Sequence, residues 1–210
     1  EDPIPRYIIK KEILRTTPDE SDWKTVQNSK WYLQLFMEQW ENGSWGRFHT
    51  QDTKSKTKQI FPTTEAALCR ALDLSLDYND ERLKKTICLM ERFLLDEETW
   101  LDKNEHHDNF QEAFKTIITA NLSLFSPFHP LVLRKKEACV QVLSKACEDG
   151  CFDEAIWEKE DRKSGNILLR PYMVYVPWLL QNNPFLNKKL ESLYLQYIWH
   201  REKGIYYRLE

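Results

Sequence analysis

The chain has 210 residues, with 30 Lys or Arg and 33 Asp or Glu, so its formal net charge is −3. No nucleic-acid-binding surface is expected, because such surfaces carry a clear excess of positive charge. No apolar run approaches the ~18 residues of a membrane span, and the 8 Trp, 9 Tyr and 10 Phe indicate a large core or an aromatic-lined pocket.

Three short helices are predicted before residue 40. Residues 3–17 have the spacing of an amphipathic helix, and residues 19–28 form a second helix whose acidic start suits the helix dipole. The third helix covers residues 31–37, ends near Gln39 and pairs with the second. The polar residues 49–59 then form a solvated loop.

Two further hairpins are predicted between residues 62 and 150. A threonine caps the first helix, which stops near residues 77–79, and its partner starts at Asp80. The next helix follows Asp108, and its partner leads to Gly150, a suitable residue for a helix stop. The expected buried faces of these four helices are Leu68, Ala71, Leu72 and Leu76; Leu83, Ile87, Met90 and Leu94; Phe110, Phe114, Ile117, Ile118 and Leu122; and Val132, Cys139, Val140, Leu143 and Cys147.

The last part of the chain is predicted to hold a short connecting helix over residues 152–163 and a fourth hairpin. Pro177 should kink the first helix of this hairpin or confine it to a short piece. The second helix carries a regular apolar stripe, made of Leu186, Leu190, Leu193, Tyr194, Tyr197 and Ile198. No segment has a strand pattern, so the predicted fold class is all-α.

Aromatic residues recur after these hairpins at a nearly constant spacing. Trp45, Trp100, Phe152 and Tyr206 are separated by 55, 52 and 54 residues, a period in the range of helical repeat units. We therefore predict a single repeat domain over residues 1–210, with hairpins ending near residues 45, 100, 152 and 206.

The segment from Leu35 to Trp45, with Gln39, Gly43 and Trp45 in place, resembles the QW motif of the prenyltransferase and squalene-oxidase repeat. This repeat occurs in terpenoid cyclases and is related to protein prenyltransferase β-subunits. The resemblance implies an α/α toroid of helical hairpins with a central apolar cavity for isoprenoids. Four hairpins are too few for a full ring, which leaves an open arc, a part of a larger protein or half of an oligomeric assembly.

The residues of this motif suit a structural role. Gln39 can donate and accept hydrogen bonds at a helix C-terminus, Gly43 permits a left-handed turn, and the Trp45 ring can cover the helix end. The Asp-x-Asp-Asp acid of terpenoid cyclases and the Asp-Asp-x-x-Asp pattern are missing, and only separated aspartates such as Asp73 and Asp77 are present. This argues against cyclase activity.

One dense cluster of acid-base groups offers a catalytic alternative. It consists of Asp102, His106, His107 and Asp108, which could bind a divalent metal or move protons. A solvated loop with a helix cap is the simpler interpretation, because neighbouring His side chains on an extended segment point apart. Four further residues are candidate ligand-binding groups at a cavity mouth or in a pocket wall, namely Trp31, His49, Tyr175 and Trp178.

The cysteines predict a cytoplasmic protein without a metal or other cofactor. There are five, an odd number, and four lie on or beside predicted apolar helix faces, as reduced core residues do. Cys147 and Cys151 have a C-x3-C spacing, but Gly150 separates them and no neighbour completes a zinc site.

Three functional hypotheses follow. The first is a non-catalytic repeat protein, or one of unassigned activity, that binds an apolar, isoprenoid-like ligand or a partner helix on an aromatic concave face. The second is a divergent terpenoid cyclase or prenyl-transfer enzyme, in which Asp102, His106, His107 and Asp108 replace the missing aspartates. The third is a protein-interaction scaffold whose concave side is filled by its own side chains.

Overall fold

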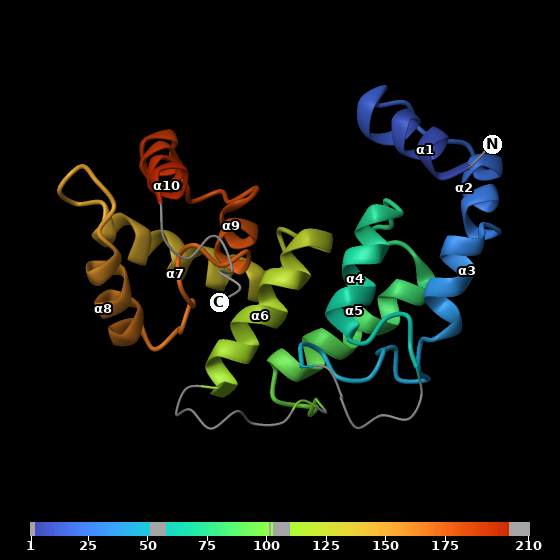
Figure 1. Ribbon diagram of the computed structural model, residues 1–210, viewed down its shortest axis with the longest axis horizontal. Coiled ribbons are helices and arrows are strands. Elements are labelled where there is room, and N and C mark those ends of the chain that lie inside the picture. The colour runs from blue at the N-terminus through green and yellow to red at the C-terminus, as the bar shows by residue number, and fades with distance from the viewer. Residues whose placement is uncertain (1–2, 51–57, 101, 103–109, 202–210) are drawn as a thin grey trace, which may run out of the picture. The chain divides into compact units, whose positions relative to one another are not determined.

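A computed structural model describes residues 3–50, 58–100, 102 and 110–201. The ordered elements in these ranges are all helical, with no strand among them, which confirms the all-α fold class. The chain divides into two compact units, residues 1–103 and 104–210 (Figure 1). Two of the four predicted hairpins fall in each unit, and each unit is described by itself.

The described residues of the N-terminal unit form five α-helices and one short π-helix. Their bounds are α1 Pro3–Ile8, the π-helix η1 Ile9–Ile13, α2 Glu20–Gln27, α3 Lys30–Met37, α4 Thr64–Asp73 and α5 Glu81–Leu94. Asp19, Thr63 and Asp80 cap α2, α4 and α5, and each side chain accepts a backbone hydrogen bond from the first turn of its helix. The predicted starts of these three helices are therefore confirmed.

The first predicted helix is only partly correct. Ile4 and Tyr7 are buried, whereas Ile9, Ile13 and Leu14 are exposed. The π-helical turns of η1 close i to i+5 hydrogen bonds, which changes the angular spacing and moves these residues off the α-helical stripe. As a result η1 buries none of its own residues.

Helix α4 ends at Asp73, earlier than predicted. Ser75 has a φ of 57°, its N–H donates to Leu72 O, and the N–H of Leu76 donates to Ala71 O. This is a Schellman closure of a helix C-terminus, in which a serine occupies the left-handed position that glycine usually takes. Sequence reasoning missed it because it looked for the usual stop residues.

In the described part of the C-terminal unit, four helices pack around a fifth, α7. Their bounds are α6 Phe110–Phe125, α7 Pro130–Ala146, α8 Glu154–Ser164, α9 Tyr175–Leu180 and α10 Lys188–His200. Helix α7 packs against α6, α8, α9 and α10 (Figure 1). Helix α9 has only six residues, as expected from Pro177. Helix α7 stops at Ala146, before the predicted stop at Gly150, which lies in the following turn with a φ of 81°.

No single helix in the described ranges is long and apolar enough to cross a bilayer. Helices α6 and α7 reach that length and apolarity only together, and they are bent by 113° at the break between them.

A lysine lies in the core of the C-terminal unit. The Lys136 side chain on α7 is 0% exposed, and its Nζ donates to Gln181 O at 2.7 Å and to Asn182 O at 3.2 Å. These carbonyls lie just beyond the last residue of α9, where helix carbonyls need partners. Burial lowers the pKa of Lys136.

The stripe expected on α10 is less buried than predicted. Tyr194 is buried and its hydroxyl donates to Pro171 O at 2.6 Å. The five other predicted members, Leu186, Leu190, Leu193, Tyr197 and Ile198, are half-buried. In contrast, Leu195 and Trp199 are exposed, and Trp199 reaches 85% exposure.

The cysteine prediction is correct for two of the five residues. Cys139 and Cys147 are buried, and burial raises the pKa of Cys139 to about 12, so its thiol is protonated at neutral pH. Cys69, Cys88 and Cys151 are exposed and are not core residues, because they lie on the outer faces or in the turns of their segments. All five are free thiols.

Candidate functional site

The corner after α3 has the helix-end contact expected of Trp45. The indole is 0% exposed, and its Nε1 donates to Leu35 O at 2.8 Å. Leu35 lies in the last turn of α3, so the ring satisfies one of the carbonyls that the helix leaves without a partner.

Gln39 and Gly43 join this corner to α5. The Gln39 side-chain amide donates to Gly43 O and Arg82 O, both at 3.1 Å, and to Thr86 Oγ1 at 3.2 Å. Gly43 has a φ of 93°, and a Cβ there would lie 2.7 Å from the backbone carbon of Lys85. Gln39 therefore bridges to the N-terminal half of α5 rather than capping the end of its own helix.

The later corner aromatics do not repeat these hydrogen bonds. Trp100 donates from Nε1 to Gly46 O at 3.0 Å, whereas Phe152 stacks on Tyr197 with ring centroids 4.1 Å apart. Tyr206 lies outside the described residues. The corners after α3, α5 and α7 thus share an aromatic position but differ in their contacts.

The structure gives Asp102 an anchoring role. Its carboxylate accepts hydrogen bonds from the N–H groups of Phe48, His49 and Thr50 and from the Thr50 hydroxyl. These contacts fix the segment that follows the Trp45 corner. The other three members of the predicted catalytic cluster, His106, His107 and Asp108, lie outside the described residues, so that cluster stays a prediction.

The predicted ligand-binding residues fall into three separate settings. His49 Nδ1 lies 2.7 Å from Glu65 Oε2, and Lys30 Nζ lies 4.3 Å from the centroid of the Trp31 ring. Tyr175 is buried and makes an edge contact with Trp178 at 5.6 Å between ring centroids. Of the four, Tyr175 and Trp178 are the two that the described structure places in contact.

Metal binding has no candidate in the described ranges, where no three His, Cys, Asp or Glu side chains gather into a possible metal site. The buried Asp161 instead accepts two contacts from the N–H of Leu168, at 2.8 and 2.9 Å, which ties α8 to the segment before α9. Desolvation by burial raises the pKa of Asp161 despite this hydrogen bond and the nearby Lys135.

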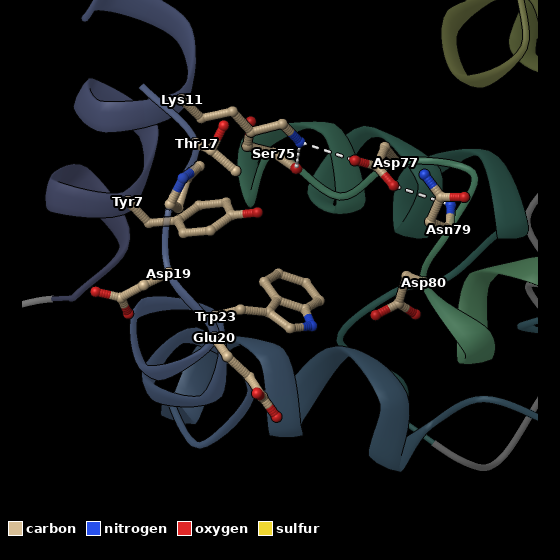
Figure 2. A pocket seen from close by; sticks show the side chains of 11 residues that line it. Tyr7, Lys11, Thr17, Asp19, Glu20, Trp23, Ser75, Asp77, Asn79 and Asp80 are labelled. Carbon is tan, nitrogen blue, oxygen red and sulfur yellow. Dashed lines mark hydrogen bonds and ion pairs between the residues drawn. The ribbon is translucent and has the colours of Figure 1, made fainter. Parts of the chain in front are cut away.

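A pocket in the N-terminal unit has a volume of about 410 Å³ (Figure 2). It lies between α1 and η1 on one side, the start of α2, and the connection from α4 to α5. Its lining consists of Tyr7, Lys11, Thr17, Pro18, Asp19, Glu20, Trp23, Ser75, Asp77, Asn79 and Asp80. The two rings that face it, Tyr7 and Trp23, have centroids 5.4 Å apart and are inclined by 38°.

Four acidic residues line the same pocket as these rings. Asp19, Glu20, Asp77 and Asp80 all line the pocket, against one basic residue, Lys11. The hydrogen bonds from the Ser21 hydroxyl and the backbone N–H of Asp22 lower the pKa of Asp19. A local negative charge is therefore built into a pocket that is also lined by aromatic rings.

Asp77 and Asp80 are held in place by the backbone. Partial burial alone would raise the pKa of Asp77, but hydrogen bonds from the N–H of Asn79 and from Lys11 outweigh it and lower that pKa. Asp80 accepts hydrogen bonds from the N–H groups of Arg82 and Leu83 and, at 2.8 Å, from the Tyr32 hydroxyl. Both carboxylates have fixed positions.

Lys11 enters this pocket from η1. Its Nζ donates to Ser75 O at 2.8 Å and to Asp77 Oδ2 at 3.0 Å, and it lies 5.8 Å from the centroid of the Tyr7 ring (Figure 2). The pocket therefore already contacts a cation through a ring face, a carbonyl and a carboxylate.

Sequence reasoning did not find this pocket. Both rings and two of the carboxylates, Asp19 and Glu20, come from residues 7–23, whereas Asp77 and Asp80 come from residues 75–80, and no local pattern indicates that the two segments meet. Asp19 and Asp80 were interpreted only as parts of helix starts, which they are. The remaining signal, an aromatic residue beside each acidic segment, is too common to be diagnostic.

No protein-family model, curated protein or solved structure matches the chain. The prenyltransferase-like resemblance thus depends on the sequence motif and on the repeat period, and the candidate site has to be judged from its own geometry.

Proposed function

We propose that the chain is a binding protein whose N-terminal unit holds a positively charged organic group in the pocket of Figure 2. The observation that carries this proposal is the combination of two aromatic rings and four carboxylate side chains in the lining of one pocket of about 410 Å³. Ring faces and carboxylates both carry negative charge density and therefore attract cations. The apolar rings can also pack against the carbon atoms of an organic cation.

The expected affinity is modest. A cation over an aromatic face contributes about 0.5–2 kcal/mol, and hydrogen bonds to a charged group contribute about 1.5–3 kcal/mol. Together these suggest a binding free energy near −4 kcal/mol, which corresponds to a dissociation constant on the order of 1 mM. Such a site recognises a group on a larger molecule or a metabolite present at high concentration.

Isothermal titration calorimetry with n-butylammonium and with tetramethylammonium tests this function. Asp77→Asn removes a carboxylate from the pocket and should weaken binding at least threefold. Asp73→Asn, at an exposed position of α4 outside the pocket lining, makes the same change of charge and should leave binding unchanged. Absence of binding for both cations, or equal losses in the two variants, would reject the proposed function.

A second candidate is the apolar-ligand function implied by the prenyltransferase-like resemblance. It is favoured by a hollow of about 660 Å³ on α10 whose described lining includes Leu195, Ile198 and the largely exposed Trp199. That volume is in the range of small-molecule sites, so the occupant in this proposal is an apolar small molecule rather than a helix. The toroid-like array of hairpins belongs to the same proposal, supported by the aromatic corners after α3, α5 and α7.

Native mass spectrometry of the purified chain tests this second candidate. A co-purifying lipid-like molecule that is lost in Trp199→Ser would support it. A protein without bound lipid that also fails to bind farnesol would leave α10 as an ordinary surface. The divergent-enzyme and scaffold hypotheses stay predictions, because three members of the catalytic cluster lie outside the described residues.

A further inference from the structure

The ammonium group of Lys11 occupies part of the proposed cation site. It donates to Ser75 O and to Asp77 Oδ2 and faces the Tyr7 ring, so it uses each kind of contact that the site offers a cation. The contacts of Lys11 therefore show that an ammonium group fits this position. Lys11 would also compete with a cationic ligand for the same position.

The acceptors around the ammonium are positioned by the backbone and not by Lys11. The left-handed conformation of Ser75 and the hydrogen bond from Leu76 N to Ala71 O close α4 and fix the Ser75 carbonyl. Asp77 Oδ1 accepts a hydrogen bond from the N–H of Asn79 at 2.9 Å, which orients the carboxylate. The acceptors are therefore preorganised for an ammonium from another molecule.

Lys11 itself is held less firmly. It lies on η1, which buries none of its residues, and the side chains of Lys11 and Asp77 are 25% and 49% exposed. Ion pairs with this exposure contribute little to stability, because water and salt screen them. The contact between the Glu12 carboxylate and the Ser75 hydroxyl, at 2.8 Å, holds η1 beside the pocket without using the acceptors of the Lys11 ammonium.

The acceptor set distinguishes among cations. A primary ammonium has three N–H donors, which can satisfy a carbonyl and a carboxylate while the group still faces a ring. A quaternary ammonium has no N–H and leaves both acceptors unsatisfied. We propose that the pocket binds a primary alkylammonium group, carried by a lysine side chain or a free alkylamine, and that Lys11 occupies this subsite until such a ligand displaces it.

This inference rests on the proposed cation-binding function and is tested by Lys11→Met, which keeps the aliphatic stem and removes the ammonium. If Lys11 fills the subsite about nine-tenths of the time, the variant should bind n-butylammonium about tenfold more tightly than the wild type. Lys24→Met is the matched control, because it removes an exposed lysine of α2 outside the pocket lining and should leave the affinity unchanged. Lys11→Ala serves as a second variant if Lys11→Met fails to fold, as judged by circular dichroism.

Calorimetry with three cations completes the test. In Lys11→Met, tetramethylammonium should bind about tenfold more weakly than n-butylammonium, because it cannot donate the charge-assisted hydrogen bonds. Nα-acetyl-lysine N-methylamide should bind more tightly than n-butylammonium if the source is a protein segment, and equally if it is a free amine.

Two results would overturn the inference while the proposed function stands. One is an unchanged n-butylammonium affinity in both Lys11 variants while Asp77→Asn still weakens binding, which would mean that Lys11 does not compete. The other is a preference for tetramethylammonium, which would mean that the acceptors are not used. Failure of every cation to bind any variant would reject the proposed function itself, and this inference with it.

Discussion

Gly43→Ala should destabilise the N-terminal unit by about 2–5 kcal/mol. Two effects add. A left-handed φ costs a residue with a Cβ about 1–2 kcal/mol, and forcing an atom into a packed site costs about 1–3 kcal/mol. At Gly43 the φ is 93°, and the new Cβ would lie 2.7 Å from the carbonyl carbon of Lys85 and 2.9 Å from its oxygen. The close neighbours are backbone atoms of α5, which cannot rotate away as a side-chain tip can.

Gly46→Ala is a matched control for this prediction. Gly46 has the same φ of 93°, but its nearest neighbour would be a ring atom of Trp40 at 3.4 Å, an ordinary contact distance. Urea and thermal unfolding followed by circular dichroism should show a loss for Gly43→Ala that exceeds the control by about 1–3 kcal/mol. For a unit of this size that excess lowers the melting temperature by about 4–8 °C per kcal/mol. A difference below about 0.5 kcal/mol would refute the proposed packing of the turn on α5.

Three further predictions concern single polar contacts. Gln39→Met removes the amide that joins Gly43 O, Arg82 O and Thr86 Oγ1, and it should cost about 1–2 kcal/mol of unfolding free energy in the same assays. Asp102 accepts from Phe48 N at Oδ2 and from Thr50 N at Oδ1, and Asp102→Asn cannot accept at both positions, so limited proteolysis should cut faster near Thr50. Unchanged cleavage would contradict the anchoring role. Burial lowers the pKa of Lys136 in the folded state. At pH values between this lowered pKa and the ordinary value near 10.5, the unfolded state therefore binds more protons than the folded state. The wild type should therefore gain unfolding free energy relative to Lys136→Met across that alkaline range, and parallel pH profiles would contradict the lowered pKa of Lys136.

The parts of the fold that were predicted correctly depend on neighbouring residues in the sequence. The helix starts near Asp19, Thr63 and Asp80 were predictable because a cap and the N–H it binds are two or three residues apart. The shortness of α9 follows in the same way from Pro177. Burial was harder to predict on α10, where five of six stripe residues are only half-buried, because periodicity shows a face but not whether another element covers it.

The candidate site could not be predicted from the sequence for a different reason. Tyr7 and Asp77 line one pocket because η1 lies beside the end of α4. There Ser75, which has a left-handed conformation that sequence patterns assign to glycine, donates a hydrogen bond to Glu12 of η1. The Gln39 contacts show the same limit. Gln39 was expected to form hydrogen bonds at the end of its own helix, whereas its partners on α5, Arg82 and Thr86, lie more than 40 residues away and could not be named from the motif.

Asp80 makes three kinds of contact. It caps the start of α5, accepts a hydrogen bond from the Tyr32 hydroxyl and lines the pocket. A molecule that binds to this carboxylate also contacts the hydrogen bond that links α3 to the start of α5. The unfolding free energy of the N-terminal unit should therefore rise with ligand concentration. At a hundredfold excess over its dissociation constant, such a ligand adds about 2.7 kcal/mol against unfolding. Ligand binding can therefore be measured as an increase in the stability of the N-terminal unit.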